Sequence, residues 1–450
     1  MKVIRSKSIF IKTQDSELID YLRRHTTFQL PVKIIRGKPT PPVYITQMRP
    51  FNDNIYELER NHIELLEAYG LDLEVIDKSV KVPAQIPKPL FTLRDDQQEV
   101  YDSVEDTGDI FIQGNAGFGK TITALALAHK FQQKTLVVCT NVGIANMWVA
   151  EIKKWFGITA GKIMEGRVSN LESPIVVSNI QTLTRRHREY CRSFGVIIID
   201  EAHHTSASTF LDVVANSYAS IRIALSATPK RADGMHCIFK GMFGSRQWRI
   251  PKENNVLSPT IIQVDTDFEL GGGELWANNL TELYDNDEYK ALAVILSDLL
   301  VRCGHKVLMT SDRLSLLDFA INNSTSKTVR ISSVEGTNER EELLKKVYSG
   351  EVEILASSIS IMKEGISVNP LSALVLTGST NNESLLEQVI GRIQRMYDGK
   401  HNPVVVDICL SCPLGTKHAR ERRKFYSTKG WKVLKAKSLE DLAEKIKQLL

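Results

Sequence analysis

The sequence predicts an α/β protein, with a small N-terminal α/β domain followed by two parallel-sheet domains in tandem. Two series of short apolar runs carry this prediction, because each run is bounded by turn signals and separated from the next by a helical stretch. Such runs are typical of strands buried on both faces of a parallel sheet. The first series is DIFIQG, TLVVCT, SPIVVS, FGVIIID and SIRIALS, and the second is PTIIQVD, KVLMTS, KTVRIS, VEILASS, ALVLTG and NPVVVDI.

The N-terminal block has a different pattern, in which alternating and helical segments mix. Its expected elements, in order, are a strand over 3–12, a helix capped by Asp15 or Ser16, a strand near 41–48, a helix over 57–70 and a strand over 71–76. The proline-rich stretch KVPAQIPKPL (81–90) then reads as an extended linker. A turn-rich stretch, FGSRQWRIPKENNVLSP, ends the first parallel-sheet domain. The expected domains are therefore 1–85, 86–256 and 257–450.

Composition limits the class of protein. Of the 450 residues, 42% are hydrophobic and 24% are charged, which excludes a disordered chain. The net charge of +4 does not exclude a nucleic-acid binder. The start, MKVIRSKSIF, lacks the apolar stretch of a signal peptide, and no run approaches the ~18 apolar residues of a membrane helix. We therefore expect a cytoplasmic protein with no membrane partner. Cys409 and Cys412 form a CxxC without a second pair, which favours reduced thiols over zinc.

A glycine-rich motif, GxxxxGK[ST], directly follows the apolar run DIFIQ and opens a helical stretch. Its glycines allow backbone N–H groups to wrap a polyphosphate, and the helix N-terminus adds favourable dipole charge. Lys120 is expected to reach the β- and γ-phosphates, and the Thr121 hydroxyl is expected to bind Mg²⁺. The predicted phosphate site consists of Gly114, Asn115, Ala116, Gly117, Phe118, Gly119, Lys120 and Thr121.

Two carboxylates close the apolar run VIIID, 80 residues downstream of Lys120. A carboxylate at the end of a buried strand beside a phosphate loop suits Mg²⁺, so Asp200 is the second predicted metal ligand. Glu201 is expected to orient and polarise an attacking water, as a general base does. His203 is expected to couple this site to another motif, with a structural histidine as the alternative.

With these motifs the chain resembles the superfamily 2 helicases of DEAH type, over about residues 90–410. The resemblance implies two RecA-like domains, ATP hydrolysis with Mg²⁺, and roles for further residues. Arg94 and Gln97 would read the adenine, and Ser226 and Thr228 would link hydrolysis to domain movement. The segment 388–395, which resembles motif VI, would supply Gln388 to the ATP site and two catalytic arginines to the transferred phosphate. These arginines are Arg392 and Arg395, and the alternative for them is surface ion pairing.

The same resemblance implies contacts to the nucleic-acid backbone from small polar side chains at strand ends. Such contacts fix the register of the strand without reading its sequence. The alternative for each residue is an ordinary turn former, since Ser, Thr and Asn are common in turns. The residues are Thr140, Asn141, Ser178, Asn179, Gln181, Ser311, Arg313, Ser357, Ser358 and Gly365.

Within the family, the chain is most similar to compact phage helicases of the UvsW type and to the branch-migrating helicases of T5-like phages. The expected partners are thus ATP and branched or forked DNA, and the expected state is a monomer or weak self-association. The location would be the host-cell cytoplasm if the chain is phage-encoded. An RNA helicase is the main alternative, although Val389 stands where many RNA helicases carry an arginine. An ATP-gated clamp and a nuclease motor are further alternatives.

Two other features bear on nucleic-acid binding. Residues 417–437 hold nine Lys or Arg and one acid, Glu421, interleaved with aromatic residues, which suits a backbone-tracking groove with stacking platforms. The alternative is a solvated helix face. Phe239, Phe243 and Trp248 are candidates for a strand-separating wedge, but core packing is the favoured interpretation.

Overall fold

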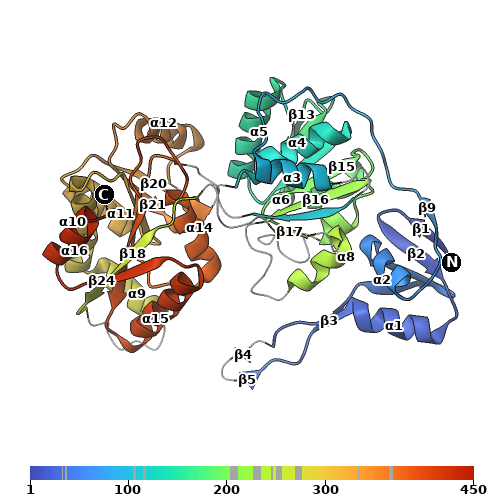
Figure 1. Cartoon of the computed structure of the whole chain (residues 1–450), viewed down its shortest axis with the longest axis horizontal. Coiled ribbons are helices and arrows are strands. Elements are labelled where there is room, and N and C mark those ends of the chain that lie inside the picture. Colours follow the sequence, from blue (N-terminus) through green and yellow to red (C-terminus); the bar gives the residue numbers. More distant parts are fainter. Residues whose placement is uncertain are drawn as a thin grey trace. The chain divides into compact units, whose positions relative to one another are not determined.

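The computed structural model describes the whole chain except residues 33, 36–37, 105–107, 115–117, 203–210, 227–234, 245–246, 250–255, 269–275, 333, 364–367 and 450. The fold is α/β, as predicted, and its elements are drawn in Figure 1. Met1–Asn115 and Gly119–Lys252 form one compact unit, and Glu253–Leu450 form the body of a second. The N-terminal block therefore shares a unit with the first parallel-sheet domain. None of the helices in the described ranges combines the length and hydropathy needed to cross a bilayer.

The N-terminal block is built on a five-stranded sheet of order β7-β8-β2-β1-β9. Helix α1 (Ser16–Thr26) is capped by the Asp15 carboxylate, and its apolar face packs on the sheet with α2 (Ile63–Ala68). The strands are β1 (Lys2–Arg5), β2 (Ser8–Lys12), β7 (Met48–Asn52), β8 (Ile55–Glu59) and β9 (Glu74–Asp77).

Two expectations for this block are wrong. The stretch 3–12 forms a hairpin of β1 and β2 rather than one strand, because the alternation continues through the turn at Ser6 and Lys7. The expected helix over 57–70 starts only at Ile63, since its first residues complete strand β8 and a short 3₁₀ turn.

The first parallel-sheet domain has strand order β13-β12-β14-β11-β15-β16-β10-β17 among the described residues, and only the β12–β13 pair is antiparallel. Buried apolar clusters cover both faces, as continuous apolar strands require. The strands are β10 (Ile110–Gln113), β11 (Thr135–Cys139), β12 (Gly161–Met164), β13 (Arg167–Ser169), β14 (Ile175–Asn179), β15 (Val196–Ile199), β16 (Ile221–Ser226) and β17 (Gln247–Arg249). The helices are α3 (Asp95–Ser103), α4 (Lys120–Phe131), α5 (Val142–Phe156), α6 (Ile180–Tyr190) and α8 (Phe239–Phe243).

The second unit has a parallel sheet of order β20-β21-β19-β22-β23-β18-β24, again with apolar clusters on both faces. The strands are β18 (Thr260–Thr266), β19 (Val307–Ser311), β20 (Thr328–Ile331), β21 (Ile354–Ser358), β22 (Ala373–Leu376), β23 (Val404–Leu410) and β24 (Lys432–Ala436). The helices are α9 (Trp276–Asp285), α10 (Asp287–Arg302), α11 (Leu314–Asn323), α12 (Thr337–Tyr348), α13 (Ile359–Lys363), α14 (Glu383–Ile393), α15 (Pro413–Thr428) and α16 (Leu439–Lys447).

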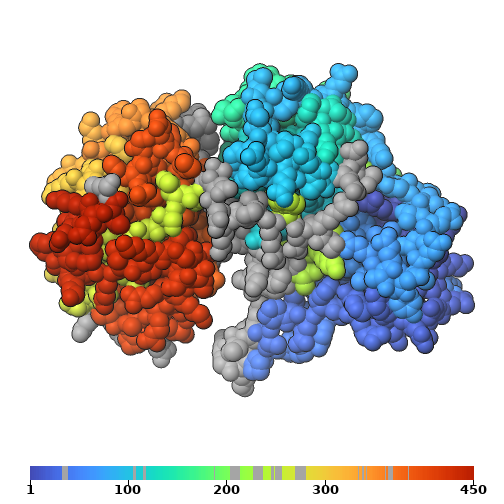
Figure 2. Space-filling view, viewed as in Figure 1, coloured from blue at the N-terminus to red at the C-terminus, as the bar shows by residue number. Residues whose placement is uncertain are grey.

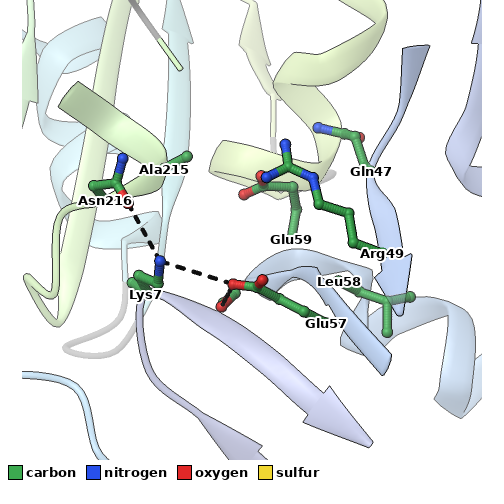
Figure 3. A pocket seen from close by; sticks show the side chains of 9 residues that line it. Lys7, Gln47, Arg49, Glu57, Leu58, Glu59, Ala215 and Asn216 are labelled. Carbon is green, nitrogen blue, oxygen red and sulfur yellow. Dashed lines mark hydrogen bonds and ion pairs between the residues drawn. The ribbon is translucent and has the colours of Figure 1, made fainter. Parts of the chain in front are cut away.

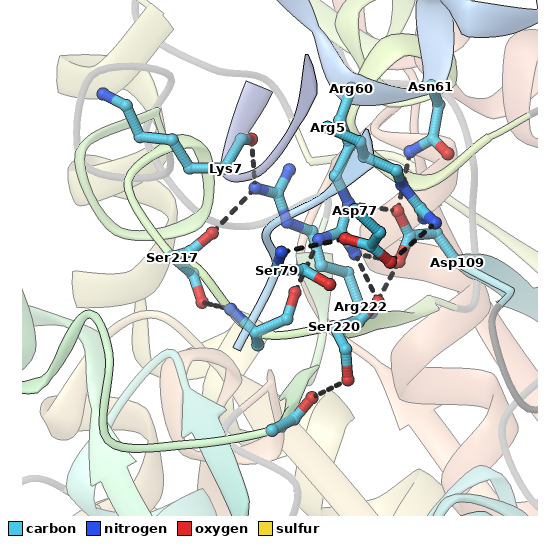
Figure 4. Close-up of polar contacts among 12 residues, drawn as sticks. Arg5, Lys7, Arg60, Asn61, Asp77, Ser79, Asp109, Ser217, Ser220 and Arg222 are labelled. Atoms are coloured by element: carbon cyan, nitrogen blue, oxygen red, sulfur yellow. Dashed lines mark hydrogen bonds and ion pairs between the residues drawn. The ribbon is translucent and has the colours of Figure 1, made fainter. Parts of the chain in front are cut away.

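A buried polar network joins the N-terminal block to the first parallel-sheet domain (Figure 4). Arg60 of the block forms an ion pair with Asp109, and neither side chain is exposed. The Arg60 guanidinium also donates to the carbonyl oxygens of Ala219 and Ser220. Arg222 of β16 donates to the Lys7 carbonyl oxygen at 2.6 Å. The block is thus fixed to the domain through charges that are removed from solvent.

A small cavity lies beside this network (Figure 3). Its volume is about 110 Å³, and its lining comes from both the block and the domain. Lys7 spans it, because its Nζ donates to Asn216 Oδ1 at 3.2 Å and lies 3.9 Å from Glu57 Oε1. Space for a few waters at most makes the cavity a feature of the junction rather than a ligand site.

Candidate functional site

The phosphate loop follows strand β10 and leads into helix α4, which is the context that its motif requires. Gly119 caps the helix with a φ of 85°, a left-handed conformation that glycine adopts without strain. Lys120 begins the helix, and its Nζ donates to the Gly114 carbonyl oxygen at 2.9 Å. Thr121 lies half-buried in the first helical turn. The predicted residues Asn115, Ala116 and Gly117 lie outside the described residues.

The predicted adenine-reading residues lie against this loop. A Cβ atom on Gly119 would stand 2.5 Å from Gln97 Nε2, so the two residues are in close contact and glycine is required there. The Gln97 Oε1 atom accepts a hydrogen bond from the Arg94 backbone N–H, which fixes the side chain at the start of α3. Arg94 in turn pairs with Asp96 at 3.2 Å. The two segments meet although more than twenty residues separate them in sequence.

The predicted metal ligand Asp200 lies directly after β15, and its side chain is buried. Its Oδ2 accepts a hydrogen bond from the Trp148 indole at 2.8 Å, and its Oδ1 accepts one from the Glu201 backbone N–H at 2.9 Å. Burial, together with the neighbouring Glu201 charge, raises the pKa of Asp200 to about 6, while Trp148 and Lys120 act in the opposite direction. A buried carboxylate with restrained oxygens and a hydroxyl in the first turn of α4, at Thr121, are the kinds of oxygen ligand that Mg²⁺ takes.

Glu201 occupies a left-handed backbone conformation with a φ of 49°. This is uncommon for a residue with a side chain, and such conformations cluster at functional sites. Its Oε1 lies 4.0 Å from Lys120 Nζ, so the lysine, the buried aspartate and the glutamate lie at one edge of the sheet. His203, predicted to couple this site to another motif, lies outside the described residues.

Trp148 is a member of this site that the sequence did not reveal. It lies on α5, is completely buried, and donates to a carboxylate 52 residues away. The sequence offers only a general indication of this role, which is that a buried tryptophan usually needs a hydrogen-bond partner for its N–H.

Replacing Trp148 with phenylalanine is expected to weaken the Mg²⁺ site. The change removes a hydrogen bond to a buried carboxylate, an interaction of about 1.5–3 kcal/mol. We expect the Mg²⁺ concentration for half-maximal ATPase to rise about tenfold or more. Trp155→Phe is the matched control, because Trp155 lies on the same helix and its indole donates to Glu151 at 2.5 Å, away from the site. Equal Mg²⁺ dependence in the two variants would contradict the assignment.

Ser226, predicted to couple hydrolysis to movement, ends strand β16 and is fully buried. Its carbonyl oxygen accepts a hydrogen bond from the Gly114 backbone N–H at 3.0 Å, so the motif contacts the first residue of the phosphate loop. Thr228 lies outside the described residues.

The motif VI residues belong to α14 and its C-terminal end, in the second unit. Gln388 is buried, and Arg392 is buried with its Nε donating to the Met362 carbonyl oxygen at 3.0 Å. Arg395 is half-buried, and burial lowers the pKa of its guanidinium. The approach of either arginine to a nucleotide on the first unit stays a prediction.

The candidate nucleic-acid contacts fall into two groups. Ser178, Ser311 and Ser357 are fully buried. The hydroxyls of Ser178 and Ser357 donate to main-chain carbonyl oxygens, and the Ser311 hydroxyl accepts from the Arg313 backbone N–H, so these three residues hold strand ends in place. Their hydroxyls are used inside the fold, and contact of these residues with nucleic acid stays a prediction.

Two of the other candidates are exposed. Gln181 is exposed and donates to the Thr140 carbonyl oxygen at 2.7 Å, which ties two predicted motifs together. Arg313 is exposed and donates to Thr281 at 2.9 Å. Nucleic-acid contact by the remaining residues stays a prediction: Asn141 caps α5, Asn179 is buried beside Gln181, Ser358 is half-buried, and Gly365 lies outside the described residues.

The basic C-terminal segment, residues 417–437, also contains both buried residues and exposed cations. Arg422 forms a fully buried ion pair with Asp407, so it stabilises the second unit rather than a ligand. Phe425 and Tyr426 are buried, and Trp431 packs on them. Phe425 and Tyr426 are therefore not available to stack on bases. The exposed cations are Lys417, Arg420, Arg423 and Lys424 on α15 and Lys432, Lys435 and Lys437 on or beside β24.

The wedge candidates are core residues. Phe239 and Phe243 are buried and pack on Phe111 beneath the sheet, and Trp248 packs against the other apolar cluster. Core packing, the favoured interpretation, is confirmed for all three residues.

Two family models match the chain. Residues 90–231 match "Type III restriction enzyme, res subunit", and residues 289–397 match "Helicase conserved C-terminal domain". Together they match part of each parallel-sheet domain. Among solved structures, S. cerevisiae Dbp5 bound to RNA and ADP BeF3 matches with a TM-score of 0.59 at 11% identity, over 87% of this chain and 97% of that one. This likeness shows the fold alone.

Two curated relatives extend over most of the chain. "Probable helicase D10" of Escherichia phage T5 is 39% identical over 440 residues, which is 96% of this chain and 96% of that protein. "DNA 3'-5' translocase XPB2" of Sulfurisphaera tokodaii is 24% identical over 79% of this chain and 91% of that protein. With the two family models, the phosphate loop and the paired carboxylates at one sheet edge, the chain belongs to the superfamily 2 helicases and is an ATP-hydrolysing enzyme.

Proposed function

We propose that this helicase is a DEAH-type, ATP-dependent DNA helicase that unwinds and branch-migrates branched DNA. Its substrates would be forks, Holliday junctions and R-loops in DNA recombination, repair or replication. The main support for ATP-driven activity is the convergence of Lys120, Asp200 and Glu201 at one edge of the first sheet. The three residues converge because they follow strands of a parallel sheet, and the carboxyl ends of these strands meet at that edge.

In this proposal each side chain has one task in hydrolysis. Lys120 exchanges its bond to the Gly114 carbonyl oxygen for the β- and γ-phosphates of ATP. Thr121 and Asp200 would hold Mg²⁺, which neutralises charge on the phosphates when bound. Glu201 accepts a proton from the attacking water, and the Lys120 ammonium lies 4.0 Å from its carboxylate.

The second unit would complete the site. Arg392 and Arg395 would stabilise charge on the transferred phosphoryl group when the two domains close on ATP. Arginines supplied from a separate domain tie hydrolysis to opening and closing, which is how a motor converts ATP into movement. Ser226 supports this coupling, since its backbone contacts Gly114 of the phosphate loop.

Branched DNA as the substrate rests on similarity rather than on the geometry of the ATP site. One relative is a probable helicase of phage T5, and another is named as a DNA translocase. The exposed cations of α15 suit phosphate contacts of low sequence specificity. An RNA substrate is the alternative, because "Putative ATP-dependent RNA helicase L396" of Acanthamoeba polyphaga mimivirus is 26% identical over 87% of this chain.

A strand-separation panel tests the proposal. It contains a DNA fork, a four-way DNA junction, a tailed DNA duplex and a matching RNA duplex, all at one salt concentration because phosphate-driven binding depends on salt. We expect ATP-dependent unwinding that favours the fork and the junction, and no unwinding by Lys120→Ala. Preference for the RNA duplex would overturn the substrate, and full ATPase in Lys120→Ala would overturn the site.

A further inference from the structure

A two-stranded arm extends from the N-terminal block between α1 and β7. Strand β3 (Thr27–Gln29) pairs with β6 (Tyr44–Thr46), and a bond from the Leu30 N–H to the Val43 carbonyl oxygen prolongs the ladder. A second short pair, β4 (Ile34–Ile35) with β5 (Lys38–Pro39), lies further out. Figure 1 shows the arm leading from the end of α1 to β4 and β5, and Figure 2 shows it as a narrow projection of the blue block.

The root of this arm is fixed to the first parallel-sheet domain. Leu30 and Ile45 pack against the apolar cluster that includes Phe239 and Phe243. Just beyond the arm, the Gln47 amide donates to the Ile238 carbonyl oxygen at 3.0 Å and its Oε1 lies 2.8 Å from His62 Nε2.

The contact of Gln47 and His62 with helix α8 is tightly packed. A Cβ atom on Gly241 of α8 would stand 2.6 Å from both Gln47 Oε1 and His62 Nε2. Helix α8 and the turn before it are the first described elements after strand β16 and its coupling residue Ser226. The root of the arm is therefore held by the part of the domain that follows the coupling motif, so the arm moves with the ATP-binding domain.

The outer part of the arm carries apolar side chains that the block does not cover. Val32 is 46% exposed, Val43 is 55% exposed and Tyr44 is 60% exposed. Tyr44 lies opposite Gln29 on the side of the ladder away from Leu30 and Ile45. Val43 precedes Tyr44 and therefore lies on the opposite face of the ladder, so the Tyr44 ring is the apolar surface on its own face, and leaving it in water is unfavourable.

The charge of this region identifies the kind of partner. From Tyr21 to Asn52 the sequence contains six Lys or Arg and no Asp or Glu. Arg23, Arg24 and Arg49 of this stretch are exposed. A basic stretch of sequence with these exposed arginines suits the phosphate backbone. Exposed aromatic and aliphatic side chains suit base faces, which a duplex offers only where its pairing ends.

We propose that the β3–β6 pair of this arm contacts the branch point of the nucleic acid, with Tyr44 stacking on a base at the end of the duplex. The proposal rests on the proposed helicase activity and adds a site to it. Because the root of the arm is fixed to the ATP-binding domain, each domain movement would press the same side chain against the junction. This gives the wedge role to the arm, after Phe239 and Phe243 proved to be core residues.

Tyr44→Ala and Tyr44→Phe test the proposal in the full chain. A stacked base contributes about 1–3 kcal/mol, which corresponds to roughly 5- to 150-fold. We expect fork unwinding by Tyr44→Ala to fall at least fivefold, with unchanged ATPase stimulation by single-stranded DNA. Tyr44→Phe keeps the ring and should unwind normally. Leu90→Ala, which trims a side chain that is 73% exposed elsewhere in the unit, is the control.

A second measurement reports contact directly. 2-Aminopurine placed at the branch of the fork should be quenched by wild type and by Tyr44→Phe, and less by Tyr44→Ala. Normal unwinding and quenching by Tyr44→Ala would overturn the arm site while leaving the motor intact. Loss of self-association in Tyr44→Ala, with normal unwinding, would overturn it in favour of a second copy of the chain. Absence of DNA-stimulated ATPase in wild type would instead overturn the proposed function.

Discussion

Glu201→Gln is expected to lower the turnover of ATP by about 10²–10⁴-fold, the usual contribution of a general base. The amide keeps the size and planarity of the carboxylate but cannot accept a proton from water. ATP binding should be retained, because Lys120 and the phosphate loop are unchanged. The measurements are kcat for DNA-stimulated ATPase and the equilibrium affinity for a fluorescent ATP analogue. A loss of affinity in place of a loss of kcat would contradict the role.

The chain provides a closely matched control for this variant. Glu165 also has a left-handed backbone conformation, with a φ of 52°, but its side chain is exposed in the turn between β12 and β13. Glu165→Gln therefore makes the same chemical change on the same kind of backbone, away from Lys120. We expect normal turnover in this variant. If both variants lost activity alike, the loss would reflect the strained backbone rather than a base.

The parallel sheets were predictable because their strands are buried on both faces. Runs such as VIII in β15 and TLVVC in β11 need no partner to be recognised, since continuous apolar residues of this length have few other places in a fold. The phosphate loop was predictable for a related reason. Its glycines and lysine act through local backbone geometry, so the whole of the required pattern lies within eight residues.

Pairings between distant polar groups were not predictable. Nothing in the sequence around Trp148 points to Asp200, 52 residues away, and nothing around Arg60 points to Asp109, 49 residues away. Both pairs depend on which elements the fold brings together. The prediction of one helix over 57–70 was wrong for a similar reason. The strand there ends in charged residues and runs into the helix, so no turn signal in the sequence separates the two.

Arg60→Ala is expected to destabilise the first unit by about 3–5 kcal/mol, the cost of leaving a buried charge without its partner. The Asp109 side chain is fully buried, and the Arg60 Nε donates to it at 2.6 Å. Burial alone would raise the pKa of Asp109, but Arg60 and Arg222 hold it below its ordinary value. The measurement is the free energy of unfolding of the full chain in urea.

Arg186→Ala is the control for this effect. Arg186 also pairs with a carboxylate, Glu189 at 2.7 Å, but both side chains are solvent-accessible on α6. Exposed ion pairs contribute little to stability, so this variant should unfold almost as wild type does. An equally small effect of Arg60→Ala would mean that water reaches Asp109 and that the block rests only loosely on the domain.

A large effect would also change how the N-terminal block can be studied. Asp109 takes hydrogen bonds from Arg60 and Asn61 of the block, and Arg222 donates to the Lys7 carbonyl oxygen. Deleting residues 1–85 would remove these partners together and leave an acid and an arginine facing solvent or each other at the edge of the domain that binds ATP. Loss of activity on deletion would then report damage to the ATP-binding domain. The contribution of the block to DNA binding is separable only by exchanging exposed side chains, such as Tyr44 and Arg23, that do not line this junction.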